Sequence, residues 1–187
     1  DWPAHSCHGY FLRPGDPTRP ILFDVEPIRD GHSFVTRRVV AVQRGRAVFS
    51  LDVSCHRPEP GLEHQAAPSD VPPPEDLPTE ADLIEHARET HPEVVGDWSA
   101  PRRPFEFRWA ESSIVELVDE DQPPRLRCWF RLAEALPAAW DRPAVHAALL
   151  LYASDHTILD TAILPHAGSF DHERHQIASL DHALWFH

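Results

Sequence analysis

AVFSLDVSCH, running from Ala47 to His56, alternates apolar and polar side chains at nearly every position. Ala47, Phe49, Leu51, Val53 and Cys55 fall on one side of an extended chain, and the polar residues between them fall on the other. Successive side chains of a β-strand point to opposite faces of its sheet. The period of two therefore predicts a half-buried strand, with one face on the core and one facing water.

The sequence before this strand reads as more antiparallel β-structure. A short strand is expected from His8 to Leu12, ending at the Pro14-Gly15 turn. The segments ILFDVEPIRDG (21–31) and FVTRRVVAVQ (34–43) predict two further strands, with turns at Asp30-Gly31 and Arg44-Gly45. Consecutive strands joined by short turns predict an antiparallel sheet.

The composition changes after His56. Prolines recur from Pro58 to Pro78, and proline is excluded from the interior of helices and sheets, so this stretch is predicted to be a linker. It leads to one short helix. Thr79 suits the N-cap, Asp82 stands three residues later as in a capping box, and Pro92 lies just past the expected end.

A second module is predicted after the linker. FEFRWAES (105–112) and RLRCWFRLAEA (125–135) alternate like strands, and Asp141 with Pro143 suits the start of a helix. Residues 144–153 are apolar almost all round, which predicts a buried helix. IASLDHALWFH (177–187) predicts a closing strand.

Strands beside one buried helix define an α+β module. We divide the chain into a first module (1–62), a linker with a short helix (63–100) and a second module (101–187), and we interpret the modules as an internal duplication. We also expect the first module's helix to precede Asp1 and further strands to follow His187.

Charge and composition exclude several classes of function. The formal net charge of −13 disfavours a nucleic-acid binder, which normally carries a basic face. Two arginine groups, Arg37/Arg38/Arg44/Arg46 and Arg102/Arg103, are either local anion sites or solvated strand faces. No apolar run reaches the roughly 18 residues needed to span a bilayer. Cys7, Cys55 and Cys128 form no CxxC pair and suit a reducing cytosol.

Asp155 and Ser179 are the candidate catalytic residues. Asp155 follows the expected end of the apolar helix. There the negative end of the helix dipole and partial burial both disfavour the ionised carboxylate, which makes it a stronger general base. The alternative is a carboxylate that caps the helix and faces solvent. Ser179 interrupts an apolar strand, where its hydroxyl needs a partner, catalytic or simply a nearby backbone carbonyl.

Other sites have weaker signals. The loop histidines His166, His172 and His175, with Asp171 and Glu173, match no zinc spacing and are interpreted as a solvated loop. His8 either lines a pocket or packs as a surface imidazole. No G-x-S-x-G elbow, Walker A motif or dinucleotide fingerprint is present, so no cofactor or metal is predicted.

Several motifs together resemble one family. HGYFLRPGD (8–16), DVEPIRDGHSFVTRRVVAVQRG (24–45), LEHQ (62–65), YASD (152–155) and SLDHALWFH (179–187) occur in the order found in the type II acyl-CoA thioesterases, the TesB-like proteins. The resemblance implies a double hotdog fold, here lacking its N-terminal helix and C-terminal strands. It implies hydrolysis of fatty acyl-CoA to free acid and CoA in the cytoplasm by a homo-oligomer of lipid metabolism.

The same resemblance implies residue roles. The family holds and polarises a water with an aspartate, a serine or threonine, and a glutamine; Asp155 and Ser179 match the first two. The glutamine is expected beyond His187, and Gln176 does not match it. Two alternatives remain open at this point: a non-catalytic acyl-CoA-binding hotdog protein, and a hotdog hydratase acting on enoyl-CoA, for which no paired Asp and His motif is found.

Overall fold

A computed structural model describes residues 2–92, 103–111, 122–169, 171 and 174–186 of the chain. The chain forms two compact units, each assembled from segments that are distant in sequence. Unit 1 contains residues 1–64, 139–155 and 177–187, and unit 2 contains residues 65–138 and 156–176. The segments of the two units alternate along the sequence. The modules 1–62 and 101–187 and their origin by duplication remain predictions.

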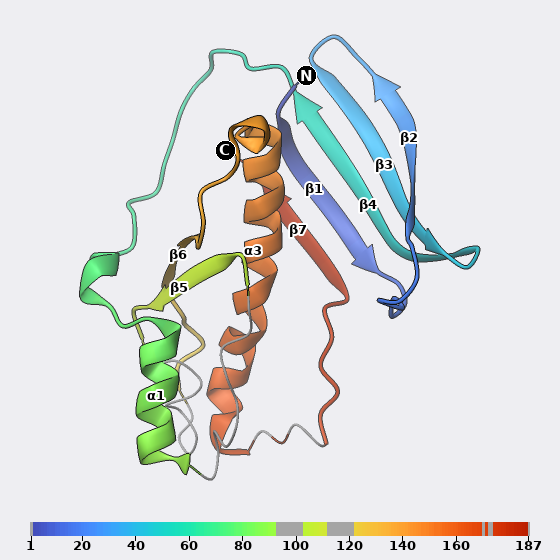
Figure 1. Cartoon of the computed structure of the whole chain (residues 1–187). Coiled ribbons are helices and arrows are strands. Elements are labelled where there is room, and N and C mark those ends of the chain that lie inside the picture. Colours follow the sequence, from blue (N-terminus) through green and yellow to red (C-terminus); the bar gives the residue numbers. More distant parts are fainter. Residues whose placement is uncertain (1, 93–102, 112–121, 170, 172–173, 187) are drawn as a thin grey trace. The chain divides into compact units, whose positions relative to one another are not determined.

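Unit 1 is built on an antiparallel sheet with the strand order β2-β3-β4-β1-β7 (Figure 1). Its strands are β1 (Ala4–Phe11), β2 (Leu22–Asp30), β3 (Phe34–Gln43), β4 (Arg46–His56) and β7 (Asp181–Trp185). The four strands expected in the first part of the chain are thus confirmed, with bounds that differ slightly. The last strand, expected in the second module, pairs instead with β1.

The hairpin between β3 and β4 is set by its turn. Arg44 and Gly45 have φ values of 51° and 72°, and Gln43 pairs with Arg46 across the turn. Two consecutive positive φ angles are the signature of a type I′ turn, whose twist matches that of the flanking strands. The predicted turn at Arg44-Gly45 therefore sets the pairing of Gln43 with Arg46 and of Val42 with Ala47, and the register shifts by one residue between Val42 and Ala41.

Gly9 in β1 marks the crowded face of the sheet. A Cβ atom at this position would lie 2.6 Å from Cζ of Phe49 and 3.2 Å from Cδ1 of Leu51. In the register, Gly9 lies between Leu51 of β4 and His182 of β7. Directly opposed residues of antiparallel strands share a face, so His182 belongs to the face on which the Phe49 ring covers Gly9.

Unit 2 has its own small core. It contains η1 (Pro74–Asp76), α1 (Glu80–Thr90), the hairpin of β5 (Phe105–Trp109) and β6 (Cys128–Leu132), and η4 (Leu164–Ser169). Phe105, Phe107 and Trp109 are buried, as the alternation of β5 predicts. They lie in a core with Leu83, Ile84 and Ala87 of α1. The helix begins with the predicted capping box between Thr79 and Asp82.

The long helix α3 (Pro143–Ile163) starts at the predicted proline but does not end at residue 153. The apolar run ends at Ala153, yet no proline or glycine interrupts the chain until Pro165, and the helical backbone continues. The expectation of a buried helix is also wrong: Ala153 is its only buried residue among those described, while Leu150 and Tyr152 are exposed. Residues 143–155 belong to unit 1 and the remainder to unit 2.

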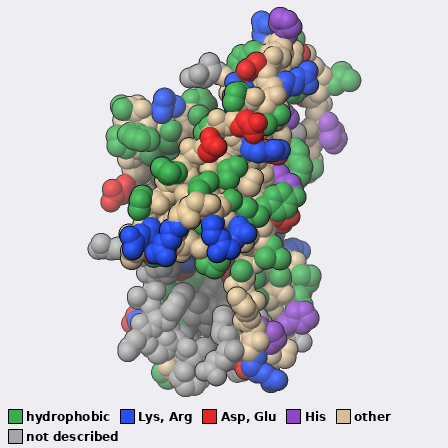
Figure 2. All heavy atoms as spheres, turned by 90° about the vertical axis from the view of Figure 1, so that its right-hand side faces the viewer, with side chains coloured by type: hydrophobic (Ala, Val, Ile, Leu, Met, Phe, Trp, Pro, Cys, Tyr) green, Lys and Arg blue, Asp and Glu red, His purple; other side chains and the backbone are tan. Residues whose placement is uncertain are grey.

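The edge strand β2 exposes every residue, including Leu22, Phe23 and Val25. Figure 2 views the molecule from the right-hand side of Figure 1 and shows hydrophobic side chains at the surface among basic and acidic side chains. Within the described part of the chain, no helix combines the length and the hydropathy needed to cross a bilayer.

Candidate active site

Asp155 and Ser179 lie in direct contact within unit 1. The Ser179 hydroxyl donates to the Asp155 carboxylate, with Oγ 3.1 Å from Oδ1 and 3.3 Å from Oδ2. The side chain of Asp155 is 36 % exposed, so water can reach the carboxylate while the protein still holds it. The structure therefore brings the two predicted residues together, at a distance where both can bind the same water molecule.

Two expectations about their surroundings are wrong. Asp155 lies inside α3 rather than at its end, because the helix continues to Ile163, so the helix-dipole argument loses its premise. Ser179 lies two positions before β7 begins at Asp181, in extended chain rather than in the strand. The neighbouring Leu180 carbonyl accepts from the amide of Phe11, which ties this lead-in segment to β1.

His182 and Ser154 complete the cluster, and no pattern in the sequence predicts a role for either of them. Nε2 of His182 lies 2.9 Å from Oγ of Ser154, and Nδ1 lies 3.6 Å from Oδ1 of Asp155. The His182 side chain is only 10 % exposed. Ser154 belongs to the motif YASD and His182 to the motif SLDH. The spacing of these motifs does not indicate that β7 places the His182 ring against Ser154 and Asp155 of α3.

The other N-terminal histidines make separate contacts. His8 reaches Asp181 at 3.4 Å, and both side chains are well exposed. His8 is paired in register with Ala183, so it lies on the sheet face opposite to His182. His5 lies 2.8 Å from the Ser54 hydroxyl and contacts the rings of Phe34 and His56. These contacts fit packing and surface roles.

The arginine groups are largely neutralised by acids. Arg37 pairs with Asp30, Arg38 with Asp52, and Arg44 with Asp16. Hydrogen bonds from Arg38 lower the pKa of Asp52 and raise that of the arginine. In the second group, Arg103 pairs with Glu80, while Arg102 lies outside the described residues. The interpretation as solvated strand faces thus fits Arg37, Arg38 and Arg44, each of which is paired with an acid.

No metal site is found where the structure can be described. No group of three or more histidine, cysteine, aspartate or glutamate side chains among those residues is arranged to hold an ion. In the loop of histidines, Nδ1 of His175 lies 2.8 Å from the Asp171 carbonyl, while His172 and Glu173 lie outside the described residues. The three cysteines are free thiols, and burial raises the pKa of Cys7 and Cys128, which disfavours reactive thiolates.

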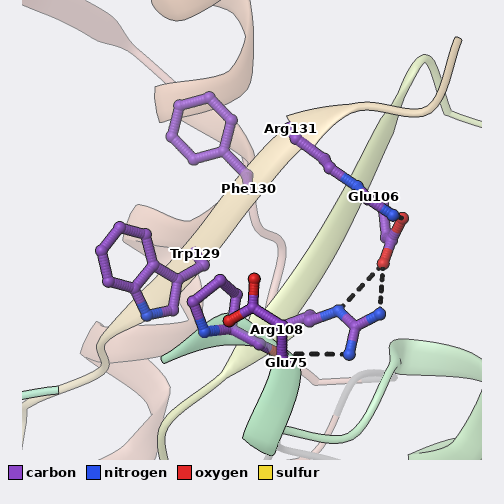
Figure 3. A pocket seen from close by; sticks show the side chains of 7 residues that line it. Glu75, Glu106, Arg108, Trp129, Phe130 and Arg131 are labelled. Carbon is purple, nitrogen blue, oxygen red and sulfur yellow. Dashed lines mark hydrogen bonds and ion pairs between the residues drawn. The ribbon is translucent and has the colours of Figure 1, made fainter. Parts of the chain in front are cut away.

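A hollow of about 130 Å³ in unit 2 has a structural explanation (Figure 3). Its lining comprises Pro74, Glu75, Glu106, Arg108, Trp129, Phe130 and Arg131. Glu106 bridges Arg131 and Arg108, and these hydrogen bonds lower its pKa. Arg108 also donates to the carbonyls of Pro74 and Leu77. The arginines that line the hollow are therefore paired with Glu106, and Arg108 also holds the proline-rich segment through Pro74 and Leu77.

Comparisons with known proteins agree with one another. A family profile described as "Acyl-CoA thioesterase N-terminal domain" matches residues 2–56, and one described as "Acyl-CoA thioesterase" matches residues 116–187. "Acyl-CoA thioesterase 2" of Haemophilus influenzae is 34% identical over 98% of this chain and 63% of its own length. Human "Acyl-coenzyme A thioesterase 8" is 34% identical over 98% of this chain and 58% of its own length.

Solved structures show the same likeness. "Acyl-CoA thioesterase II TesB2" from Mycobacterium marinum is 38% identical, with a TM-score of 0.73 over 99% of this chain and 62% of that one. A protein from Alicyclobacillus acidocaldarius described as having a "Hot dog Fold" is 21% identical with a TM-score of 0.55, a likeness of fold alone. The chain spans about three fifths of the length of the Haemophilus influenzae, human and Mycobacterium marinum proteins.

Proposed function

Because the chain belongs to the acyl-CoA thioesterase family, we propose that the protein hydrolyses acyl-CoA thioesters to a free fatty acid and CoA, using Asp155 and Ser179. The family likeness supports the reaction class and the hotdog fold, and the contact between the two side chains supports their roles. A double hotdog arrangement, a cytoplasmic location and a homo-oligomeric assembly are part of the same proposal.

The proposed reaction needs one water molecule held between the two side chains. The carboxylate of Asp155 accepts a hydrogen bond from this water, and the Ser179 hydroxyl fixes its position. The water oxygen forms a bond to the thioester carbonyl carbon while its proton passes to Asp155. The tetrahedral intermediate then expels the sulfur of CoA; the C–S bond breaks, and Asp155 returns the proton to the thiolate. Atoms and charge balance without a covalent enzyme intermediate.

The position of Ser179 favours this general-base route over a serine nucleophile. Its hydroxyl donates directly to a carboxylate, and the sequence has no nucleophile elbow to present it to a carbonyl. A hydroxyl hydrogen-bonded to the proposed base is well placed to orient a water on the same carboxylate. Ser179 is therefore assigned the positioning of water rather than attack on the substrate.

Replacement of Asp155 tests the proposal. Asp155→Asn keeps the size of the side chain and removes the base, so thiol release from a long-chain acyl-CoA, followed with a thiol reagent, should fall by about 100-fold or more. Binding of a non-hydrolysable acyl-CoA analogue should persist. Unchanged turnover would refute the catalytic role. Analogue binding by the parent protein without any thiol release would favour the non-catalytic acyl-CoA binder instead.

A further inference from the structure

The cluster around Asp155 contains His182, to which the proposed reaction assigns no role. His182 extends from β7 with a side chain that is 10 % exposed, and its two ring nitrogens face consecutive residues of α3. Nε2 lies at hydrogen-bond distance from Ser154, and Nδ1 faces the carboxylate of Asp155. A ring that is hydrogen-bonded at Nε2 and faces a carboxylate with Nδ1 has little freedom to turn.

The hydroxyl of Ser154 limits how the ring can be protonated. Its oxygen lies 2.9 Å from the Leu151 carbonyl and 2.9 Å from Nε2 of His182, and it has one hydrogen to donate. If the hydrogen goes to the carbonyl, Nε2 must carry a proton and donate to Ser154. If it goes to Nε2, the ring carries its proton on Nδ1, directed at Asp155. Both arrangements keep the ring attached to the helix.

The two carboxylate oxygens of Asp155 differ in their contacts with the protein. Oδ1 lies 3.1 Å from Ser179 and 3.6 Å from Nδ1 of His182, whereas the contact of Oδ2 with the described residues is the longer one of 3.3 Å to Ser179. The separation of 3.6 Å is beyond a good hydrogen bond and acts through electrostatics and packing. An oxygen with fewer protein partners has more room to accept from water.

We propose that His182, anchored by Ser154, is a positioning residue that fixes the Asp155 carboxylate so that Oδ2 takes the proton of the attacking water. This inference rests on the proposed function. It goes beyond it by assigning a role to His182 and Ser154 and by distinguishing the two carboxylate oxygens. The low exposure of the His182 side chain, 10 %, supports a fixed ring.

Variants of both positioning residues test the inference. His182→Ala should lower kcat by about 10- to 100-fold and leave KM within about twofold, because substrate contacts are untouched while the base is misplaced. Ser154→Ala should lower kcat less, because the ring keeps its place on the strand. The double variant should be no worse than His182→Ala alone, because both act through one contact. His182→Asn, whose amide nitrogen occupies the place of Nδ1, should recover part of kcat.

Matched controls separate this inference from the proposed function. His146→Gln removes an exposed histidine of α3 that pairs with Asp141, and it should leave kcat unchanged. Thermal unfolding of each variant shows whether the fold persists; if His182→Ala does not fold, His182→Asn and Ser154→Ala decide. If Asp155→Asn and Ser179→Ala abolish hydrolysis but the His182 and Ser154 variants keep the parent kcat, or if the double variant is additive, the positioning role is refuted alone. If the Asp155 and Ser179 variants retain activity, the catalytic roles assigned to these two residues in the proposed function fail, and the positioning role of His182 fails with them.

Discussion

The hydroxyl of Ser179 lies 3.1 Å from the carboxylate of Asp155, although 24 positions of sequence separate them. The contact depends on two structural features that meet in unit 1: a helix that continues through Asp155, and a strand, β7, that pairs with β1. Pairing with β1 brings the segment just before β7 to the helix, and so positions the serine beside the acid.

Substitution of Ser179 separates its hydroxyl from its size. Ser179→Ala should lower the turnover of acyl-CoA by about 10- to 1,000-fold, because the carboxylate loses its donor and the water loses one of its holders. Ser179→Thr keeps the hydroxyl and should retain most activity. Steady-state thiol release by both variants provides the measurement. Equal activity of the alanine and threonine variants would show that the hydroxyl has no role.

Gly9 should prove sensitive to any side chain. Gly9→Ala places a methyl group 2.6 Å from the Phe49 ring, and relief requires the ring or the strand to move, at a cost of about 1–3 kcal/mol in the free energy of unfolding. Gly15→Ala is the matched control, because a Cβ there meets nothing within 4 Å. Denaturant unfolding measures both. A Gly9→Ala protein as stable as the Gly15→Ala protein would contradict the crowding argument.

The proline-rich segment is expected to be released when its hydrogen bonds are removed. Arg108 donates to the carbonyls of Pro74 and Leu77, and Trp129 donates to that of Pro72. Arg108→Ala should therefore increase cleavage of residues 65–78 by a protease of broad specificity, since mobile segments are cut first. Arg131→Ala is the control, because Arg131 pairs with Glu106 but makes no hydrogen bond with the segment. Equal cleavage of both variants would show that the hydrogen bonds of Arg108 do not hold residues 65–78 in place.

Local patterns predicted the elements whose causes are local. Alternation identified β4, the Arg44-Gly45 pair identified its turn, and Thr79 with Asp82 identified the start of α1. Each of these signals depends on neighbours within a few residues, so it survives in a single sequence. The hotdog fold itself came from ordered motifs that resemble a family, and the comparisons confirm that recognition.

Patterns within one segment do not predict which distant strands pair with each other. The closing segment alternates well enough to be called a strand, but nothing in it specifies β1 as its partner. The length of α3 is not predicted because the expected helix is limited to the apolar run 144–153, whereas a half-exposed helix also contains polar residues. His182 was overlooked for the same reason as the pairing: its neighbours Ser154 and Asp155 come from a distant part of the chain.

Asp160 should make unit 2 sensitive to pH. Burial raises the pKa of this carboxyl to about 6, with Arg103 opposing and Glu80 reinforcing the rise. A raised pKa means that the folded state holds the proton more firmly than the unfolded chain does. The resulting stabilisation is complete below about pH 4 and is lost as the pH rises through about 6.

Asp160→Asn removes this titration while keeping the shape of the side chain. Because the parent must bury a charge near neutral pH, the variant should gain about 1–2 kcal/mol of stability relative to the parent on going from pH 4 to pH 7.5, a figure reduced for solvent screening. Free energies of unfolding of both proteins at the two pH values give the difference, in which the other titrating groups cancel. A difference that does not change with pH would show that Asp160 titrates normally, and a loss at pH 7.5 would show that its attraction to Arg103 exceeds the penalty of burial.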